Sequence, residues 1–425
     1  GNTGNLTGTA LTGLGMSAGI TYGTVEALNI SLGSGSDALT VASTHANNTV
    51  LNTLGGGDTV HVQTTAGVTV VNTGAGTDTT NVKAISAATT INAGADADTI
   101  NVGSKAPDVN GNVNAISASL TVNGEDGSDT VNVDDKSDTS GNTGNLTGTA
   151  LTGLGMLAGI TYGTVEALNV SLGSGGDTFT VASTHAHNTV LNTLGGGDTV
   201  HVQTTAGNTV VNTGAGPDTT NVKAIGAATT INAGTEADTI NVGSKAPDVN
   251  GNVNAISASL AVNGEGGSDT VNVDDTSDTS GNTGNLTGTA LTGLGMSAGI
   301  TYGTVEALNV SLGSGGDTFT VASTHANNTV LNTLGGGDTV HIQTVAGVTV
   351  VNTGVGADTT NVQTIDAATT VNAGDDADTI NVGSKAPDVN GNVNAISASL
   401  TINGEDGGDT VNVDDTADTS GNTGN

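Results

Sequence analysis

The sequence predicts an all-β fold, a parallel β-solenoid, from three observations. The chain consists of long, nearly identical copies, because "GNTGN" begins at 1, 141, 281 and 421. Inside each copy a glycine-rich turn closed by one aspartate recurs at short, nearly constant steps, and apolar residues alternate with Thr and Asn on both sides of it. Period-2 alternation is typical of strands, and short repeats that cannot bury a face alone gain a core by stacking.

This repetition divides the chain into residues 1–140, 141–280 and 281–425, the last including the start of a further copy. We expect these copies to form one continuous rod with about six coils of 20 or more residues per copy. From the first copy into the second, the turn aspartates stand at positions 37, 58, 78, 98, 129 and 177. The first three steps are ordinary coils. The step from 98 to 129 is interpreted as a coil plus an insertion, and the step from 129 to 177 as two enlarged coils.

Each coil is expected to contain a strand, the glycine turn, a second strand and a return turn. Around Asp98, for example, Ile91 stands seven positions before the aspartate, and Ile100 and Val102 stand two and four positions after it. Stacking such coils places like residues above one another. It predicts amide ladders, for example along Asn52, Asn72, Asn92 and Asn123.

The composition limits the possible partners. The chain has 40 acidic and 6 basic residues, a net charge of -34, no cysteine and 1% aromatic residues. This charge argues against nucleic acid, which requires a basic surface. No apolar run approaches the roughly 20 residues of a membrane helix, so we expect no membrane insertion in this segment. The acidity favours cations as partners.

The glycine turn has the composition of a cation site. Gly74 and Gly76 permit a tight reversal with positive φ, and Asp78 closes the turn. A stack of such turns aligns carboxylates and carbonyls, which hard cations bind. The alternative is that each aspartate only caps its turn.

These turns resemble the calcium-binding nonapeptide G-G-x-G-x-D-x-U-x of repeats-in-toxin proteins, for example "GAGTDTTNV" at 74–82 and "GSGGDTFTV" at 173–181. The resemblance implies a right-handed β-roll or β-helix with Ca²⁺ held by the aspartates. It also implies that the residue two positions later faces inward, which would be Thr80, Ile100, Phe179 and Thr360. The chain departs from the family in having one such turn per coil instead of two, so calcium is expected along one edge at most.

Carried over to every turn, the resemblance predicts fifteen calcium ligands. They are Asp37, Asp58, Asp78, Asp98, Asp129, Asp177, Asp198, Asp218, Asp238, Asp269, Asp317, Asp338, Asp358, Asp378 and Asp409.

Two further segments contain clustered oxygens. Asp108, Asn110 and Asn112 resemble the start of an EF-hand loop, but the Gly and Glu that the loop requires are missing. The cluster from Asp134 to Asp138 lies in a Gly/Ser/Thr-rich stretch at the copy boundary. For both segments we favour a solvated loop over a cation site.

No enzyme activity is expected, because the seven histidines have no recurring carboxylate partner. Outward Thr-x-Asn rows, such as Thr79/Asn81 and Thr99/Asn101, offer an alternative as an ice- or ligand-binding adhesin surface. The longer steps interrupt these rows, and aromatic residues that would stack on a glycan are nearly absent.

The stretch "GITYGTVEALNVSLGSGGDTFTV" at 159–181 is also similar to large repetitive bacterial surface proteins and adhesins. We therefore predict an extracellular structural protein on a bacterial or archaeal surface, a stalk, spacer or filament stiffened by calcium. Because solenoid ends expose unpaired strands, self-association end to end or laterally is also expected.

Overall fold

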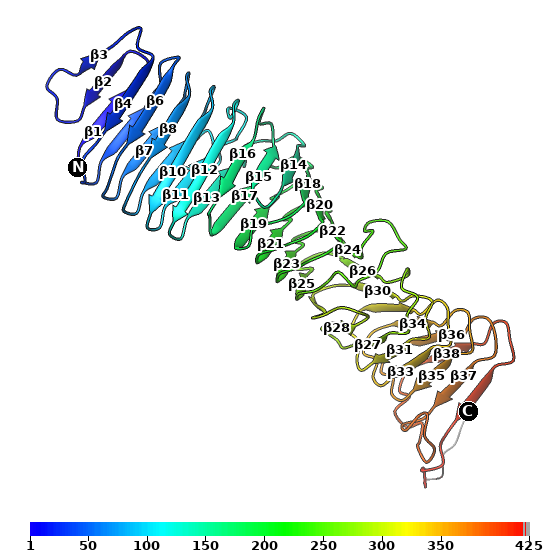
Figure 1. Cartoon of the computed structure of the whole chain (residues 1–425). Coiled ribbons are helices and arrows are strands. Elements are labelled where there is room, and N and C mark those ends of the chain that lie inside the picture. The colour runs from blue at the N-terminus through cyan, green and yellow to red at the C-terminus, as the bar shows by residue number, and fades with distance from the viewer. Residues whose placement is uncertain (420, 422–425) are drawn as a thin grey trace. The chain divides into compact units, whose positions relative to one another are not determined.

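The computed structural model describes residues 1–419 and 421, and these residues form strands and turns without any helix. The chain forms two compact units, residues 1–216 and 217–425. In each unit short strands stack side by side as the rungs of a β-solenoid (Figure 1). No helix of the described residues is long and apolar enough to cross a membrane.

Unit 1 contains two facing sheets, which we call sheet 1a and sheet 1b. Sheet 1a has the order β3 (Ile20–Thr21), β2 (Ala10–Gly13), β1 (Thr3–Leu6), β5 (Ala38–Val41), β7 (Thr59–Val62), β9 (Thr79–Val82), β11 (Thr99–Val102), β13 (Thr130–Asp134), β17 (Ala167–Ser171), β19 (Asn188–Asn192) and β21 (Thr209–Asn212). Sheet 1b has the order β4 (Ala27–Ser31), β6 (Asn48–Asn52), β8 (Thr69–Asn72), β10 (Thr89–Ala95), β12 (Leu120–Asp126), β16 (Ile160–Gly163), β15 (Ala150–Gly153), β14 (Thr143–Leu146), β18 (Thr178–Val181) and β20 (Thr199–Val202).

Unit 2 is built in the same way from sheets 2a and 2b. Sheet 2a has the order β23 (Thr229–Asn232), β25 (Leu260–Asn263), β29 (Ile300–Gly303), β28 (Ala290–Gly293), β27 (Thr283–Leu286), β31 (Thr318–Val321), β33 (Thr339–Ile342), β35 (Thr359–Val362), β37 (Thr379–Val382) and β39 (Thr410–Val413). Sheet 2b has the order β22 (Thr219–Val222), β24 (Thr239–Val242), β26 (Thr270–Asp274), β30 (Ala307–Ser311), β32 (Asn328–Asn332), β34 (Thr349–Asn352), β36 (Thr369–Asn372) and β38 (Leu400–Asn403).

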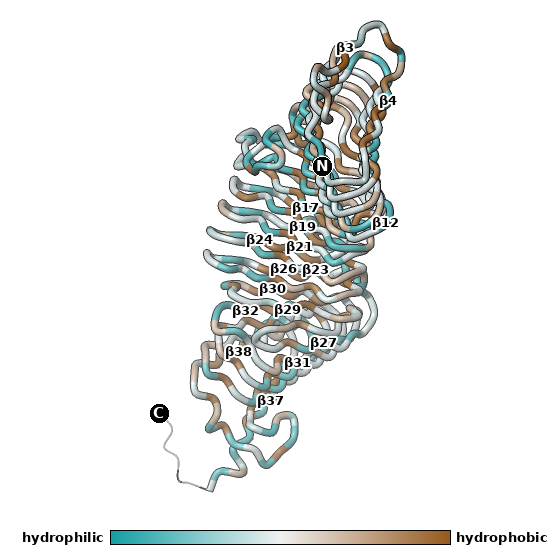
Figure 2. The backbone as a smooth tube through the Cα atoms, turned by 90° about the vertical axis from the view of Figure 1, so that its left-hand side faces the viewer, coloured by the Kyte–Doolittle hydropathy of each residue, from teal (hydrophilic) through white to brown (hydrophobic). Residues whose placement is uncertain are grey.

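The core of each unit is a stack of aliphatic rows, because parallel pairing puts equivalent residues over one another. Ile100 pairs in register with Thr80 on one side and Val131 on the other, and all three side chains are buried. Figure 2 shows hydrophobic residues returning at the same place from coil to coil. The all-β solenoid predicted from the sequence is therefore confirmed. The inward placement of Thr80, Ile100, Phe179 and Thr360 is confirmed as well.

The step from Asp98 to Asp129 is one coil with an insertion, as predicted. Strands β10 and β11 pair in register with β12 and β13, and residues 103–117 form a loop between them. Ile116 at the end of this loop is buried and forms an isolated bridge with Ile85. The insertion therefore leaves the coil and returns to it without changing the strand register.

The interpretation of the step from Asp129 to Asp177 as two enlarged coils is wrong. Strands β14, β15 and β16 form an antiparallel meander inside sheet 1b, and β27, β28 and β29 do the same in sheet 2a. The reversal from β15 to β16 contains glycines in the left-handed region, such as Gly153 with φ of 86° and Gly155 with φ of 75°. At the junction after residue 140, and again at the junction after residue 280, an antiparallel hairpin pair is thus inserted into an otherwise parallel sheet.

The meander exchanges the roles of the two sheets. In the first copy the strands that precede the aspartate turns, β4 to β12, lie in sheet 1b; after the junction their equivalents β17 and β19 lie in sheet 1a. The chain therefore crosses from 1b to 1a at the early aspartate turns and from 1a to 1b at the later ones. The aspartate turns change from one edge of the unit to the other, which corrects the expectation that they line a single edge.

Candidate functional site

The turn aspartates form ladders of hydrogen bonds from coil to coil. In the first copy the backbone N–H of Asp58 donates to Oδ1 of Asp78 at 2.6 Å, and Asp78 donates in the same way to Asp98 at 2.7 Å. The ladder begins where Asn2 donates to Asp37 and includes Asp37 to Asp58 and Asp98 to Asp129. The Oδ1 atom of each aspartate therefore accepts a hydrogen bond from the neighbouring coil.

The same ladder recurs beyond each junction. In unit 1 the Asn142 N–H donates to Asp177, and Asp177 donates to Asp198, both at 2.7 Å. Unit 2 contains the continuous series Asp317, Asp338, Asp358, Asp378 and Asp409, as well as the bonds from Asp218 to Asp238 and from Asp238 to Asp269. All fifteen aspartates predicted from the sequence thus belong to ladders.

Glutamates that the sequence analysis did not select end two of these ladders. The Asp129 N–H donates to Oε2 of Glu166 at 2.7 Å, and the Asp269 N–H donates to Oε2 of Glu306 at 2.8 Å. The available signal was the single acidic residue in each "TVEALN" stretch, which has no counterpart in the ordinary coils. These glutamates supply the acceptor that the next coil would otherwise provide.

The ladder carboxylates are buried, and only one of their two oxygens accepts a hydrogen bond. Asp58, Asp78 and Asp129 are at most 1% exposed, and the other ladder aspartates up to Asp378 are at most 4% exposed. Their Oδ2 atoms are buried and make no hydrogen bond, as seen at Asp37, Asp58, Asp78, Asp98, Asp129, Asp177, Asp238, Asp269, Asp317, Asp338, Asp358 and Asp378. Burying a carboxylate oxygen without a hydrogen bond is unfavourable in free energy. A bound cation, or a proton on the carboxyl group, would reduce this penalty at each ladder.

Burial raises the pKa of several of these carboxyl groups. It raises the pKa of Asp78 to about 6 and the pKa of Asp98, Asp238 and Asp358 to about 7, against the opposing effect of the N–H bond that each accepts. Repulsion from neighbouring ladder carboxylates adds to the shift. These four carboxyl groups are therefore more readily protonated near neutral pH than an ordinary aspartate.

The glycine turns bring the coils into close contact at the same edges. Gly76 has φ of 118°, and a Cβ there would lie 2.4 Å from the carbonyl oxygen of Gly56 in the next coil. The turn backbones also pair with each other, because the Ala75 N–H donates to the Leu54 carbonyl at 2.9 Å. Among the described residues, no three Asp, Glu or His side chains surround one point closely enough to hold a metal alone. A cation on a ladder would therefore take turn carbonyls as well as Oδ2 atoms, a donor set that suits Ca²⁺.

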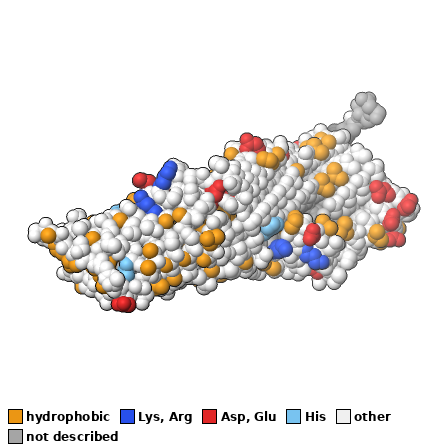
Figure 3. Space-filling view, turned by 90° about the horizontal axis from the view of Figure 1, so that it is seen from above, with side chains coloured by type: hydrophobic (Ala, Val, Ile, Leu, Met, Phe, Trp, Pro, Cys, Tyr) orange, Lys and Arg blue, Asp and Glu red, His pale blue; other side chains and the backbone are white. Residues whose placement is uncertain are grey.

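The outward faces carry amide ladders. The predicted ladder through Asn52, Asn72, Asn92 and Asn123 is confirmed, with 2.7 Å between Nδ2 and Oδ1 at each step. A second amide ladder runs on sheet 1a from Asn81 through Asn101 to Asn132. Beside it, Thr59, Thr79, Thr99 and Thr130 form a parallel row that ends at Ala167. The expectation that Asn81 faces outward is wrong, because its side chain is 1% exposed. Most of the surface in Figure 3 is uncharged, and its charged side chains stand in a few separate groups.

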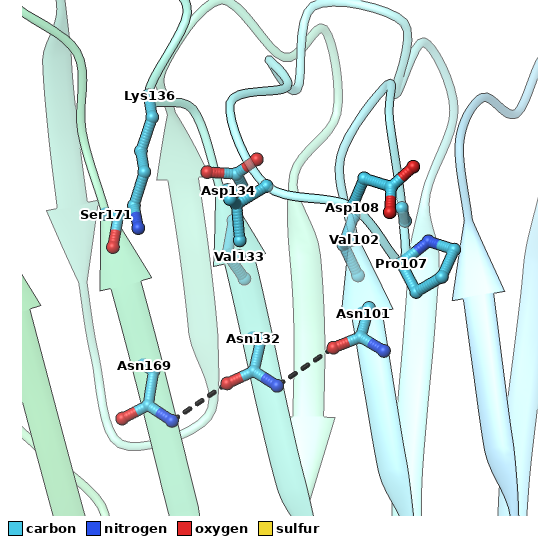
Figure 4. Close-up of a pocket in the computed structure, with 12 residues that line it drawn as sticks. Asn101, Val102, Pro107, Asp108, Asn132, Val133, Asp134, Lys136, Asn169 and Ser171 are labelled. Atoms are coloured by element: carbon cyan, nitrogen blue, oxygen red, sulfur yellow. Dashed lines mark hydrogen bonds between the residues drawn. The ribbon is translucent and has the colours of Figure 1, made fainter.

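The insertion loop covers part of this second face. Residues Ala106 to Val109 wall a groove of about 330 Å³ whose floor contains Asn101, Asn132 and Asn169 (Figure 4). The equivalent groove recurs in unit 2, with Thr276 in place of Lys136. Asp108 is exposed in the loop, as predicted. The loop therefore interrupts the Thr-x-Asn face once per copy.

Comparisons with known proteins find few relatives. No family model matches the chain, and no curated protein matches it. One solved structure that it matches is described as a hyperactive, Ca²⁺-dependent, beta-helical antifreeze protein from an Antarctic bacterium, with 15% identity over 92% of this chain and 85% of that one, and a TM-score of 0.18. At that TM-score the two molecules do not superpose as wholes, and the solenoid assignment depends on the strand register of this chain.

Proposed function

We propose that this chain is a structural extracellular repeat protein, a surface stalk, spacer or filament, whose solenoid is stabilised by calcium at the aspartate ladders. The observation that carries the proposal is the row of buried, unpartnered Oδ2 atoms that recurs along the ladders. A hard divalent cation would satisfy these oxygens and offset the repulsion between carboxylates. Near-identical copies then add length without adding a new site.

Charge supports the same proposal. The chain has a net charge of -34, and such a charge destabilises a compact state through self-repulsion. Because a cation binds the assembled ladder and not the separated coils, binding energy becomes folding energy. Extracellular fluids contain millimolar calcium, which suits sites of moderate affinity.

The test is thermal unfolding of the full chain, followed by far-UV circular dichroism, in EGTA and in millimolar CaCl₂. We expect calcium to raise the midpoint, because a ligand present at 100 times its Kd adds about 2.7 kcal/mol per site. Asp78→Asn with Asp98→Asn should reduce the calcium-dependent rise. Asp108→Asn with Asp248→Asn, in exposed loops, should leave it intact. Identical midpoints in EGTA and calcium would remove calcium from the proposal.

We further propose that the solenoid associates end to end with a second copy of this chain. Ile20 is 54% exposed, whereas its equivalent Ile160 is 2% exposed because it pairs opposite Leu120 in the preceding copy. At the other end Val411 and Val413 are 48% and 65% exposed. Ile20 and Val411 thus hold positions that are buried and paired at the internal junction, where Ile160 and Val131 occupy them.

Sedimentation velocity tests this association. Ile20→Lys should lower the sedimentation coefficient at high protein concentration, whereas Val68→Lys, a change at an exposed return turn, should not. A wild-type chain that remains monomeric across the concentration range would argue against the filament.

Ice binding is the second candidate, favoured by the in-register Thr row on sheet 1a beside its amide ladder. Against it, the row ends at Ala167 and the insertion loop lies over the neighbouring amides. Thermal hysteresis of the calcium-loaded protein decides the question. Activity that Thr79→Tyr with Thr99→Tyr abolishes would support it, and no wild-type hysteresis would dismiss it.

A further inference from the structure

The loop at each copy junction contains a buried carboxylate that the ladders do not use. Asp135 follows β13 and is 0% exposed, and Asp275 holds the same place after β26 and is also 0% exposed. The solvated loop that the sequence predicted for the cluster from Asp134 to Asp138 is therefore wrong for Asp135. The physical reason is that the insertion loop folds over the junction and covers both aspartates.

Only one of the two carboxylate oxygens of Asp135 accepts a hydrogen bond. Its Oδ1 accepts the Val113 N–H at 3.0 Å, and its Oδ2 is buried without a partner. Asp275 repeats this arrangement with Val253 at 3.0 Å, and its Oδ2 is likewise unpartnered. Both junctions thus contain a buried Oδ2 atom without a hydrogen-bond partner, so this arrangement is a repeated feature of the junction.

The charged groups that act on Asp135 are acidic. Burial raises the pKa of Asp135 to about 7 against the opposing effect of the Val113 N–H bond, and repulsion from Asp138, Asp177 and Asp134 adds to the shift. Asp177 contributes a second buried Oδ2 without a partner. The neighbouring Lys136 is replaced by Thr276 in the next junction, so a basic side chain is not part of the shared arrangement.

The junction loop is pinned between the two copies. The Ser174 N–H of the following copy donates to the Asp138 carbonyl at 3.0 Å, and the Asn142 N–H donates to Asp177. Asp138 itself accepts the Ser140 N–H at 2.9 Å and an Asn114 amide at 3.3 Å. These bonds hold the main-chain and side-chain oxygens of the junction loop in place.

We propose that each junction holds one divalent cation of the calcium class, bound by Asp135 and Asp177 in the first junction and by Asp275 and Asp317 in the second. The two carboxylates at each junction balance the charge of the cation, and Asp138 and Asp278 add a further negative charge nearby. Main-chain oxygens of the loop complete the coordination, because among the described residues no three acidic side chains converge on one point. The cation joins the end of one copy to the first turn of the next. The site does not require calcium on the ladders.

The test is the number of calcium ions bound per full chain, measured by equilibrium dialysis with ⁴⁵Ca²⁺. Asp135→Asn with Asp275→Asn keeps an acceptor for the Val113 and Val253 N–H groups and removes the free carboxylate oxygen. We expect one ion to be lost per altered junction. The control, Asp108→Asn with Asp248→Asn, makes the same charge change in exposed loops and should lose none.

An unchanged stoichiometry in the folded variant would overturn the proposal. If circular dichroism shows that this variant does not fold, Asp138→Asn with Asp278→Asn is measured instead, because these half-buried side chains keep their Oδ1 acceptor. Weaker calcium binding at the junctions is then expected, and unaltered binding would contradict it. The experiment also separates this proposal from calcium binding at the aspartate ladders. If the ladders bind no calcium, the wild type still binds the junction ions, and only those.

Discussion

At the scale of single residues, the ladder aspartates combine two opposed requirements. Each Oδ1 accepts an N–H from the neighbouring coil, which favours the charged form, while burial and the adjacent carboxylates disfavour it. The outcome is that the pKa values of Asp78, Asp98, Asp238 and Asp358 are raised towards neutrality. Such groups respond to protons and to cations over the same pH range.

The first prediction concerns pH in the absence of cations. The pKa of Asp98 is raised from 3.8 to about 7, so between these values the folded chain binds protons that the unfolded chain does not. Stability therefore falls as pH rises through this window. In EGTA we expect a higher unfolding midpoint at pH 5 than at pH 8, measured by circular dichroism.

Calcium should cancel this trend, because it binds the deprotonated carboxylates. The control is therefore the same pH series in millimolar CaCl₂. A midpoint that rises from pH 5 to pH 8 in EGTA would contradict the burial of charge that the ladders imply.

The second prediction concerns the turn glycines. Gly76→Ala places a Cβ 2.4 Å from the Gly56 carbonyl oxygen at φ of 118°, so we expect a loss of about 1–3 kcal/mol in the free energy of unfolding. Gly33→Ala is the matched control, because nothing lies within 4 Å of its Cβ position and its φ is not positive. Urea unfolding measures both. Equal losses at the two positions would show that close coil contact is not the cause.

At the scale of elements, the sequence predicted the ordinary coils well. The nearly constant steps from Asp37 to Asp98 allow one pairing register, because like residues then stack and each aliphatic row stays inside. The alternation of the strand also predicts the burial of the turn aspartate. Asp78 stands two and four positions before the inward residues Thr80 and Val82, so its side chain is expected on the same inward face.

The meander could not be inferred in the same way. Strands β14, β15 and β16 are short, and their direction depends on partners from the preceding and following coils. The spacing of residues within the segment does not indicate which strands it pairs with. The burial of Asp135 could not be predicted for a similar reason. Val113 and the loop that covers Asp135 precede strands β12 and β13 in the chain, so the contact is not local in sequence.

The third prediction tests the end of a ladder. Glu166→Ala removes the acceptor of the Asp129 N–H, and leaving a buried donor unpaired costs about 1–3 kcal/mol. Glu166→Gln retains an amide oxygen and should recover most of the loss. The measurement is urea unfolding of the full chain in EGTA. Equal stability of the Ala and Gln variants would show that the bond to Asp129 contributes little.

At the scale of the whole molecule, repetition makes the stability a sum of like terms. Each copy ends in the same junction loop and begins with the same meander, so the pairings of β12 with β16 and of β25 with β29 have the same register. In such arrays stability is the sum of repeat terms and nearest-neighbour interfaces. The length of the chain can then change while its local chemistry stays constant.

The fourth prediction follows from this sum. Deleting residues 141–280 joins the first copy to the third through the same "GNTGN" sequence, so it recreates a native junction. We expect the shortened chain to fold in calcium with a midpoint close to that of the full chain, and with its calorimetric enthalpy reduced by about a third. Deleting residues 141–210 instead removes half a copy and joins unlike strands, so it should lower the midpoint sharply. If both deletions lowered the midpoint equally, the copies would not be interchangeable, and stability would depend on interactions beyond nearest neighbours.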